Sequence, residues 1–465
     1  MSLDLAMMSA AMLAANFRAG KASPVEATRA ALDRIAALDP TLNAYVEVFT
    51  ADALRDAAAS EARWLRHEPL GPLDGVPTSI KDLTLVKGHP TLYGSRTTRK
   101  DQAWTDDSPA AGSLRRSGAV LIGKTTTPEF GWKGVTDSPL SGITRNPWDP
   151  TKTPGGSSGG AAVAVATGMA TLAVGGDGGG SVRIPAAFTG VFGLKPTAGR
   201  IPYYPPSPHG ALTHVGVLAR TVRDASLMFS VLVRPDQRDP RSFPSVDDVH
   251  APQLEEGARN LRIAFSPDLG YARVDREVAA TVKTAVDLYA SLGSRVDDVG
   301  TVFADPRAAF ETLFWVGQAK RYRALSDAQR ALVEPGFAEV AREGLAVELA
   351  RYVDAESLRI DLAIQFSRFL GDYDVLITPQ LPITAFDAGL EVPAGSGMRR
   401  WTEWTPFTYP FNLTGHPAAT VPCGFDSKGL PIAFQIVGHR HADALVLRAA
   451  RAYESVRPFK MPKVG

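Results

Sequence analysis

Two serines in glycine-rich segments and one lysine are the residues whose types and spacing could do chemistry. Ser157 lies within residues 153–160, and Ser181 ends residues 175–181, 24 positions further along the chain. Lys81 precedes Ser157 by 76 positions. Two hydroxyls and an amine are enough for acyl transfer without histidine or metal, because a neutral amine can accept a hydroxyl proton. Glycine-rich turns also leave backbone N–H groups free to meet a developing oxyanion.

The pattern around these residues extends along most of the chain. Arg-Asn-Pro-Trp-Asp-Pro at 145–150 leads into the first serine segment, and Gly-Leu-Lys-Pro-Thr at 193–197 follows the second. Two segments near the C-terminus, residues 412–418 and 429–438, belong to the same pattern. Together these motifs resemble the amidase signature family of serine hydrolases, with a weaker match between about 235 and 375.

The resemblance implies a role for each residue of the pattern. Ser181 is expected to be the nucleophile, Lys81 the terminal base, and Ser157 the bridge that passes protons between them. A cis peptide bond between Gly156 and Ser157 is also implied. The oxyanion of the tetrahedral intermediate is expected to be held by the backbone N–H groups of Gly178, Gly179 and Gly180.

Lys81 can act as a base only when its amine is neutral. Burial beside the apolar Ile80 and Leu83 disfavours the ammonium and therefore lowers the pKa of Lys81. Asp82 would raise that pKa if it faced the amine, but alternation along a strand directs neighbouring side chains to opposite faces. The sequence therefore predicts a buried, neutral lysine.

Other polar residues of the two serine segments are expected to support the loops. Asp177 and Arg183 are predicted to form an ion pair that fixes the Ser181 loop. Ser158 either helps to hold Lys81 or stabilises its own loop. These residues would then shape the site without taking part in the chemistry.

The nucleophile segment departs from the family at two positions. Gly176 and Gly178 stand where the family usually carries side chains. Because glycine has no side chain, we expect a more flexible loop and a wider pocket wall near Gly178. Aromatic residues are candidates for the rest of an acyl or aryl pocket, with ordinary packing as the alternative for each: Tyr203, Tyr204, Trp315 and Trp404.

Composition bounds the partners and the compartment. Lys plus Arg number 50 against 49 for Asp plus Glu, so no basic stripe indicates nucleic acid. Cys423 is the single cysteine, which excludes an intrachain disulfide and fits a reducing compartment. The longest apolar run, residues 161–174, is shorter than the roughly 20 residues of a membrane helix. We expect a cytoplasmic protein with no cofactor or metal and no nucleic-acid or membrane partner. A homodimer is an expectation from the family alone.

The elements that must position the site are expected to alternate between strands and helices. Ser23, Pro24 and Glu26 form a capping box at the start of a helix that Asp39-Pro40 should end. Strands are predicted at 78–81, 119–122, 171–174, 261–265 and 375–379, with helices at 51–66, 160–167, 274–292 and through much of 305–370. Residues 235–254 are polar and proline-rich, as in a linker.

This alternation favours an α/β protein. The resemblance implies the amidase signature fold, with a large, twisted, mostly parallel mixed sheet covered by helices on both faces. We expect a single domain over 1–465. Within it, residues 1–66 form a helical part, 67–210 the signature core, and 235–410 a variable part facing the substrate.

One motif gives a competing interpretation. Residues 118–125 match the phosphate-loop pattern GxxxxGKT. A phosphate loop needs flexible turn residues between its glycines, whereas residues 119–122 are Ala-Val-Leu-Ile and strand-like. Pro128 also follows too soon for a long helix. We therefore expect a strand here and no nucleotide site.

The sequence predicts a stand-alone hydrolase that cleaves C–N bonds of aryl or other small amides. Carbamates and esters pass through the same kind of tetrahedral intermediate and are further candidate substrates. The alternative is the amidase subunit of a tRNA-dependent glutamine amidotransferase, although residues 201–206 do not look like that subgroup. Intact Lys81, Ser157 and Ser181 argue against a binding protein that has lost catalysis.

Overall fold

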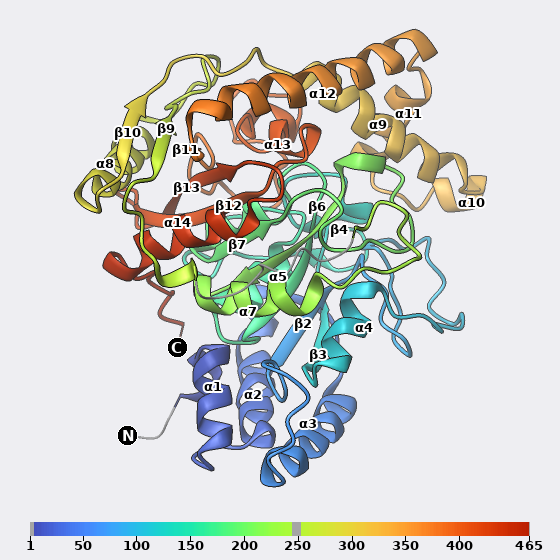
Figure 1. Ribbon diagram of the computed structural model, residues 1–465. Helices are drawn as coiled ribbons and strands as arrows, with labels where there is room; N and C mark the ends of the chain where they lie inside the picture. Colours follow the sequence, from blue (N-terminus) through green and yellow to red (C-terminus); the bar gives the residue numbers. More distant parts are fainter. Residues whose placement is uncertain (1–3, 244–252, 465) are drawn as a thin grey trace.

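A mixed sheet of eleven strands organises the molecule (Figure 1). The computed structural model describes residues 4–243 and 253–464. Its strands are β1 (Tyr45–Val48), β2 (Pro77–Lys81), β3 (Val120–Thr125), β4 (Asp137–Ser138), β5 (Gly142–Ile143), β6 (Leu172–Asp177), β7 (Phe192–Lys195), β8 (His214–Ala219), β9 (Arg262–Phe265), β10 (Arg295–Asp298), β11 (Val375–Pro379), β12 (Ala418–Phe425) and β13 (Pro431–Gly438). β4 and β5 pair separately, and the others follow the order β1-β3-β2-β6-β8-β7-β12-β13-β11-β9-β10.

Parallel pairs form two groups in the large sheet. β3, β2 and β6 are parallel neighbours on one side, and β11, β9 and β10 are parallel neighbours on the other. Antiparallel pairs through β8, β7, β12 and β13 join the two groups. The predicted α/β class with a large mixed sheet is confirmed.

Helices cover both faces of this sheet. They are α1 (Ala10–Arg18), α2 (Pro24–Leu42), α3 (Thr50–Leu65), α4 (Pro109–Arg116), α5 (Gly159–Ala166), α6 (Arg183–Thr189), α7 (Val222–Leu232), α8 (Arg276–Ser291), α9 (Arg307–Arg323), α10 (Asp327–Arg330), α11 (Pro335–Leu345), α12 (Leu349–Phe369), α13 (Pro410–Leu413) and α14 (Asp443–Val456). Short 3-10 helices are η1 (Leu5–Met7), η2 (Glu129–Gly131), η3 (Gly210–Leu212), η4 (Gln253–Glu255), η5 (Leu370–Asp372) and η6 (Trp401–Trp404).

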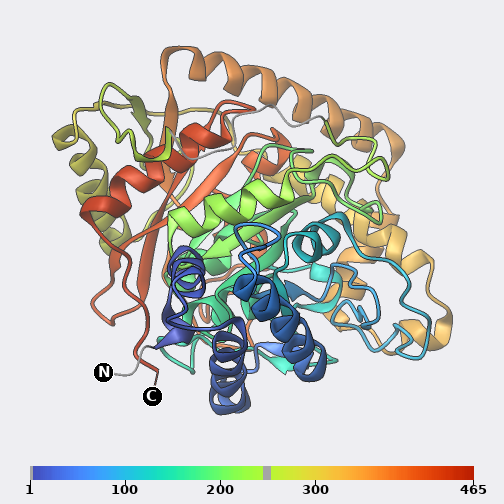
Figure 2. The same cartoon turned by 60° about the horizontal axis from the view of Figure 1, so that its bottom comes forward.

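The two faces have separate apolar cores. On the face seen in Figure 1, α7 and α14 lie over the sheet and bury residues such as Phe229 and Leu447 together with the strand residue Ile436. On the other face, α5 and α6 bury Val165 and Ala186 against the strands. Figure 2 brings the N-terminal helices α1, α2 and α3, drawn in blue, to the front. The sheet strands are therefore buried on both sides, which is why they read as nearly continuous apolar runs.

The first long helix begins where the sequence predicts and ends later. Glu26 N donates to Ser23 Oγ at 3.2 Å, and Ser23 N donates to Glu26 Oε2 at 2.8 Å, so the capping box is confirmed. The predicted end at Asp39-Pro40 is wrong, because α2 continues to Leu42 with the proline inside its last turn. Asn43 ends the helix in the left-handed conformation, at φ 51°, and its N–H donates to the Asp39 carbonyl.

The remaining element predictions mostly hold. β2, β3, β6, β9 and β11 and the helices α3, α5 and α8 lie at the expected places, and helices dominate residues 305–370. The segment that matches the phosphate-loop pattern is the buried strand β3, and its Lys124 Nζ donates to the Thr84 carbonyl at 2.6 Å. Residues 244–252 of the predicted linker lie outside the described residues.

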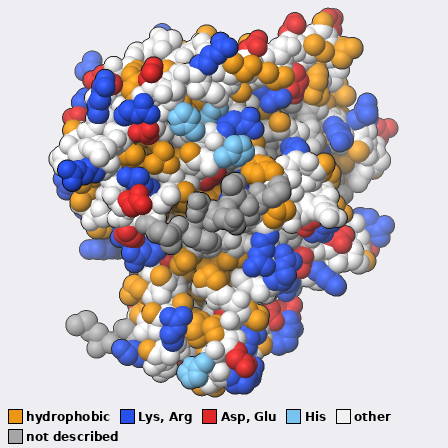
Figure 3. Space-filling model, viewed as in Figure 1, with side chains coloured by type: hydrophobic (Ala, Val, Ile, Leu, Met, Phe, Trp, Pro, Cys, Tyr) orange, Lys and Arg blue, Asp and Glu red, His pale blue; other side chains and the backbone are white. Residues whose placement is uncertain are grey.

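The surface is mixed in charge. Figure 3 shows basic and acidic side chains interspersed over the visible face. Within residues 4–243 and 253–464, no helix has the length and apolar character needed to cross a membrane.

Candidate active site

Adjacent parallel strands bring the lysine and the second serine segment to one edge of the sheet. β2 and β6 pair in parallel with Ile80 opposite Val174, so Lys81 at the end of β2 lies level with the start of the glycine run. Ser181 follows β6 in the turn before α6, and Ser157 lies just before α5. Carboxyl ends of neighbouring parallel strands are a common place for ligand sites, because the loops that follow them converge there.

The lysine contacts both serines of the first segment. Lys81 Nζ lies 2.6 Å from Ser157 Oγ and 2.9 Å from Ser158 Oγ. The peptide bond between Gly156 and Ser157 is cis. Ser158 Oγ also donates to the Gly176 carbonyl at 3.1 Å. Ser158 therefore joins the lysine to the nucleophile segment, and both roles considered for it from the sequence have a contact.

The environment of Lys81 favours a neutral amine. Its side chain is fully buried, and this burial lowers the pKa of Lys81 well below the ordinary value, against the opposing charge of Asp177. Asp82 faces elsewhere, since its carboxylate accepts the N–H of Leu92 at 3.0 Å and lies 3.7 Å from Lys124 Nζ. Alternation along β2 thus separates the carboxylate from the lysine, as predicted.

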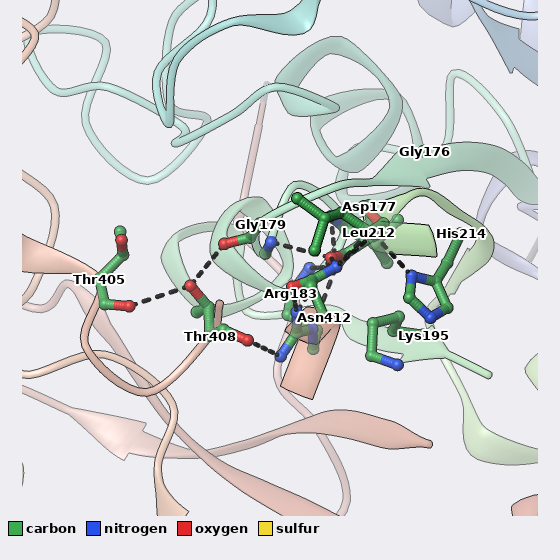
Figure 4. A network of polar contacts seen from close by, with 12 residues as sticks. Gly176, Asp177, Gly179, Arg183, Lys195, Leu212, His214, Thr405, Thr408 and Asn412 are labelled. Carbon is green, nitrogen blue, oxygen red and sulfur yellow. Dashed lines mark hydrogen bonds and ion pairs between the residues drawn. The ribbon is translucent and has the colours of Figure 1, made fainter. Parts of the chain in front are cut away.

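The predicted ion pair holds the nucleophile segment from below (Figure 4). Arg183 Nε and Nη2 donate to the two carboxylate oxygens of Asp177 at 3.0 and 2.9 Å, and both side chains are fully buried. Burial opposes ionisation of Asp177, but the charge and hydrogen bonds of Arg183 outweigh it and lower the pKa of the carboxyl. Asn412 Nδ2 donates to the same carboxylate at 2.8 Å, and Gln435 Oε1 accepts from Arg183 at 2.7 Å.

The backbone of the glycine run corrects one predicted oxyanion donor. Gly180 N donates to Asp177 Oδ1 at 2.8 Å, so this N–H is already used in holding the loop. The N–H groups of Gly178, Gly179 and Ser181 meet no acceptor in the described part of the chain. These three donors are therefore the ones available to a substrate oxygen.

A narrow pocket contains the three predicted catalytic residues. Lys81, Ser157 and Ser181 all line it, and Ser181 keeps 7% of its surface exposed. The cavity volume is about 40 Å³, far below the roughly 300–1,000 Å³ typical of ligand pockets. An aryl amide would therefore require side chains of the wall to move.

The walls differ from those predicted. Of the four aromatic candidates, Tyr203 lines the pocket. Tyr204 instead lies under the guanidinium of Arg238, 4.7 Å from its ring centre, because successive residues of an extended segment point to opposite sides. Trp315 and Trp404 are buried in the aromatic core around α9 and η6. The prediction is wrong for these three residues.

The two unusual glycines have different surroundings. A Cβ atom at Gly178 would lie 3.2 Å from Cε2 of Phe314, so a ring from α9 occupies the space beside this glycine. The expectation of a wider wall at Gly178 is therefore wrong. A Cβ atom at Gly176 would meet only the His214 carbonyl, at 3.9 Å, so open space remains there.

Sequence reasoning missed Phe314, Arg321 and Phe130, which also line the pocket. Phe314 and Arg321 are seven residues apart on α9 and so share one face of that helix. The spacing is visible in the sequence, but the direction in which this face points is not. Phe130 has φ of 53°, a conformation that nothing in its neighbours announces.

Histidines do not take the place of the lysine. His209 lines the pocket and stacks on Phe314, with ring centres 4.3 Å apart. His214 and His416 are buried but do not line it. Burial lowers the pKa of His209 and of His416 to about 3, so both rings are neutral at ordinary pH. Among the described residues, no hydrogen bond joins any of the three to Ser181.

Known proteins are similar to this chain over nearly its full length. The sequence profile of the Amidase family matches residues 26–447. An acylamidase of Rhodococcus erythropolis is 38% identical over 98% of this chain and 97% of its own. The amidase-type component of a glutamyl-tRNA(Gln) amidotransferase from Myxococcus xanthus (strain DK1622) is 36% identical over 98% of each chain. The crystal structure of a bacterial aryl acylamidase has a TM-score of 0.89 at 30% identity, over 97% of this chain and 96% of that one.

Because both the family profile and these relatives extend over almost the whole chain, the protein belongs to the amidase signature family and is an enzyme that hydrolyses amides.

Proposed function

We propose that this enzyme hydrolyses small acyl amides, anilides among them, through an acyl-enzyme on Ser181 with Ser157 and Lys81 as the proton relay. The proposal rests on one observation above all. The buried Lys81 amine lies 2.6 Å from Ser157 Oγ in the pocket that Ser181 also lines. A lysine kept neutral by burial can act as a base for a hydroxyl that is otherwise a weak nucleophile.

The proposed cycle balances at each step. Neutral Lys81 accepts the proton of Ser157, which accepts the proton of Ser181, and Ser181 Oγ attacks the amide carbon. The tetrahedral intermediate collapses as the proton returns through Ser157 to the leaving nitrogen, and the C–N bond breaks. Water then attacks the acyl ester with the same relay as base, which releases a carboxylic acid and restores Ser181.

The oxyanion of each tetrahedral intermediate would be held by backbone donors. The N–H groups of Gly178, Gly179 and Ser181 are without acceptors among the described residues, and Gly178 and Ser181 line the pocket. Each well-placed donor of this kind is worth about 3 kcal/mol in the transition state. The Asp177–Arg183 pair supports these donors by fixing the turn.

Relatives and pocket walls support the substrate class. One relative is an acylamidase and one structural neighbour an aryl acylamidase. Aromatic side chains of Phe130, Tyr203 and Phe314 line the pocket and offer flat apolar surface to an aryl group. Carbamates and esters share the tetrahedral geometry at the reacting carbon, so we include them as further substrates.

We further propose a cytoplasmic location and a single domain. Cys423 is the single cysteine of the sequence, which fits a reducing compartment. One sheet receives strands from residue 45 to residue 438, which supports one folding unit. A homodimer remains a prediction, to be tested by light scattering of the purified protein.

The testing experiment compares four substrates and two variants. Purified enzyme, Ser181→Ala and the control Ser357→Ala are assayed with acetanilide, a phenyl carbamate, a phenyl ester and glutamine. Ser357 lies exposed on α12, and its hydroxyl bonds only the Val353 carbonyl, so this control should keep full activity. We expect turnover of acetanilide that disappears in Ser181→Ala.

Three results would contradict the proposal. Turnover of glutamine alone, or only with added partner subunits, would favour an amidotransferase component. Equal turnover by Ser181→Ala would remove Ser181 from the chemistry. Loss of activity in Ser357→Ala as well would mean that the assay reports instability and not catalysis.

A further inference from the structure

One arginine in the pocket has no role in the proposed cycle. Arg321 lies in the last turn of α9 and lines the same pocket as Ser181. Its guanidinium carbon is 5.4 Å from the ring centre of Tyr93 and 5.4 Å from that of Phe130. The side chain is half-buried. A charged group is thus held against the pocket by flat aromatic faces.

This arginine has no acidic partner in the described part of the chain. Its Nε atom is buried without a hydrogen-bond acceptor, and no carboxylate of residues 4–243 or 253–464 forms an ion pair with it. Many other arginines of the molecule do have such partners. Arg183, for example, pairs with Asp177, and Arg63 pairs with Asp74.

The pocket itself supplies no negative charge for Arg321. Asp177 is the acidic residue among its described lining residues, and both of its carboxylate oxygens already accept hydrogen bonds from Arg183. His209, also in the wall, is neutral, because burial and then the charge of Arg321 lower the pKa of its ring to about 3. Lys81 is neutral in the proposed cycle. The pocket therefore carries one uncompensated positive charge.

A partly desolvated cation without an anion is unfavourable, and aromatic faces offset only part of the cost. A guanidinium stacked on rings still presents its N–H edge, whose fork matches the two oxygens of a carboxylate. The anion that this edge would bind has to come from the ligand. An amide bound at Ser181 could bring it on its acyl part or on its amine part.

We propose that Arg321 is a specificity-determining residue that binds a carboxylate carried by the substrate. The substrate class is then anionic amides, either monoamides of dicarboxylic acids or amides of amino-substituted carboxylic acids. This inference rests on the proposed function, because it places the anion in the pocket of Ser181. Hydrolysis of neutral amides remains the basal activity, and the carboxylate raises kcat/KM above it.

The test uses two pairs of substrates matched in shape. Succinanilate and 4-methylpentananilide differ in a carboxylate on the acyl part, and 3-acetamidobenzoate and 3-isopropylacetanilide differ in one on the amine part. The quantity compared is the ratio of kcat/KM for the anionic to the neutral member of a pair. Wild-type enzyme should give a ratio above one for at least one pair, and that pair identifies which part carries the anion.

Three variants assign this ratio to Arg321. Arg321→Gln should lower it roughly ten- to hundredfold, the usual range for a charge-assisted hydrogen bond. Arg321→Lys keeps the charge but not the fork and should retain part of the ratio. Arg323→Gln, two residues along the same helix and exposed, is the matched control and should leave the ratio at its wild-type value.

A ratio of one or below in wild-type enzyme for both pairs overturns the proposal, even if Arg321→Gln does not fold. An equal loss of kcat/KM for anionic and neutral members in Arg321→Gln also overturns it, because that result indicates a packing role. Neutral amides hydrolysed well under either outcome would leave the proposed function intact.

Binding separates the two proposals from the other side. Calorimetry on Ser181→Ala should detect the anionic amide, and Ser181→Ala/Arg321→Gln should bind it at least about tenfold more weakly. If wild-type enzyme hydrolyses no amide and this difference is still found, the proposed function fails and the carboxylate site stands. Equal binding by the two variants overturns the carboxylate site directly.

Discussion

Thr408 stands where a side chain at Gly180 would have to go. A Cβ atom on Gly180 would lie 2.5 Å from Thr408 Cβ, and the glycine has φ of +122°, which L residues rarely adopt. The hydroxyl of Thr408 donates to the Gly179 carbonyl at 2.6 Å. Contact and conformation together require glycine directly before the nucleophile.

We therefore expect Gly180→Ala to lower activity at least about a hundredfold, because a shifted turn misplaces both Ser181 and the oxyanion donors. Gly176→Ala is the matched control, since a Cβ atom there meets open space. It should keep activity within a few-fold of wild type. The measurement is kcat/KM for acetanilide, with melting temperatures to check folding. Equal activity of the two variants would contradict the prediction.

Phe314 is expected to limit the size of the acyl group. Phe314→Ala removes the ring that fills the space beside Gly178 and should move the best acyl chain of an anilide series toward longer chains. Loss of a buried ring also costs about 3–5 kcal/mol of unfolding free energy. Phe369→Ala, on α12 and outside the pocket lining, is the control for stability. An unchanged chain-length profile would show that Phe314 does not bound the acyl site.

Lys81→Met tests the neutral amine. Because burial lowers the pKa of Lys81 below its ordinary value of 10.5, kcat/KM of wild-type enzyme should rise with pH through that lowered pKa. Lys81→Met should lose about 10²- to 10⁴-fold in activity. The unfolded wild-type chain binds a proton at this lysine more readily than the folded chain. Unfolding free energy should therefore increase with pH, between the lowered pKa and 10.5, more steeply in wild type than in the variant.

Urea unfolding and a pH–rate profile measure these two effects. Lys100→Met, at an exposed lysine, is the control and should alter neither. A pH-independent rate, or a variant as active as wild type, would exclude Lys81 as the base.

Asp177→Asn should destabilise the fold by about 3–5 kcal/mol, because it leaves the buried Arg183 cation without its charge partner. The pKa of Asp177 is lowered from 3.8. The stability that its ionised form contributes is therefore full above that value and is lost as pH falls through the lowered pKa. Asp387→Asn breaks the exposed pair with Lys152 and should cost no more than about 1 kcal/mol. Denaturant titrations that give equal losses would contradict this view of the buried pair.

The sequence allows good prediction of what is local. The capping box of Ser23 and Glu26 involves residues three apart, and the position of β2 follows from a short apolar run before Lys81. The Asp177–Arg183 pair also joins residues of one turn. In each case the interacting groups are close in the chain, so their spacing determines the contact.

Contacts between distant segments are not predictable in the same way. Asn412 reaches Asp177 across 235 positions, and its motif in the sequence does not reveal this role. The wall of the pocket comes from α9, whose inward face depends on how the helix packs. Trp404 is predicted in that wall, but it stacks on Phe188 in the core, with ring centres 5.8 Å apart.

The origin of the pocket residues has a consequence for diversification and redesign. Lys81 stands on β2 and Ser181 follows β6 in the same sheet, whereas Phe314 and Arg321 belong to α9, more than a hundred positions later. The chemistry and the choice of substrate are therefore encoded in separate stretches of the gene. Recombination or library mutagenesis confined to α9 can vary the acyl and charge preference while the reaction stays the same.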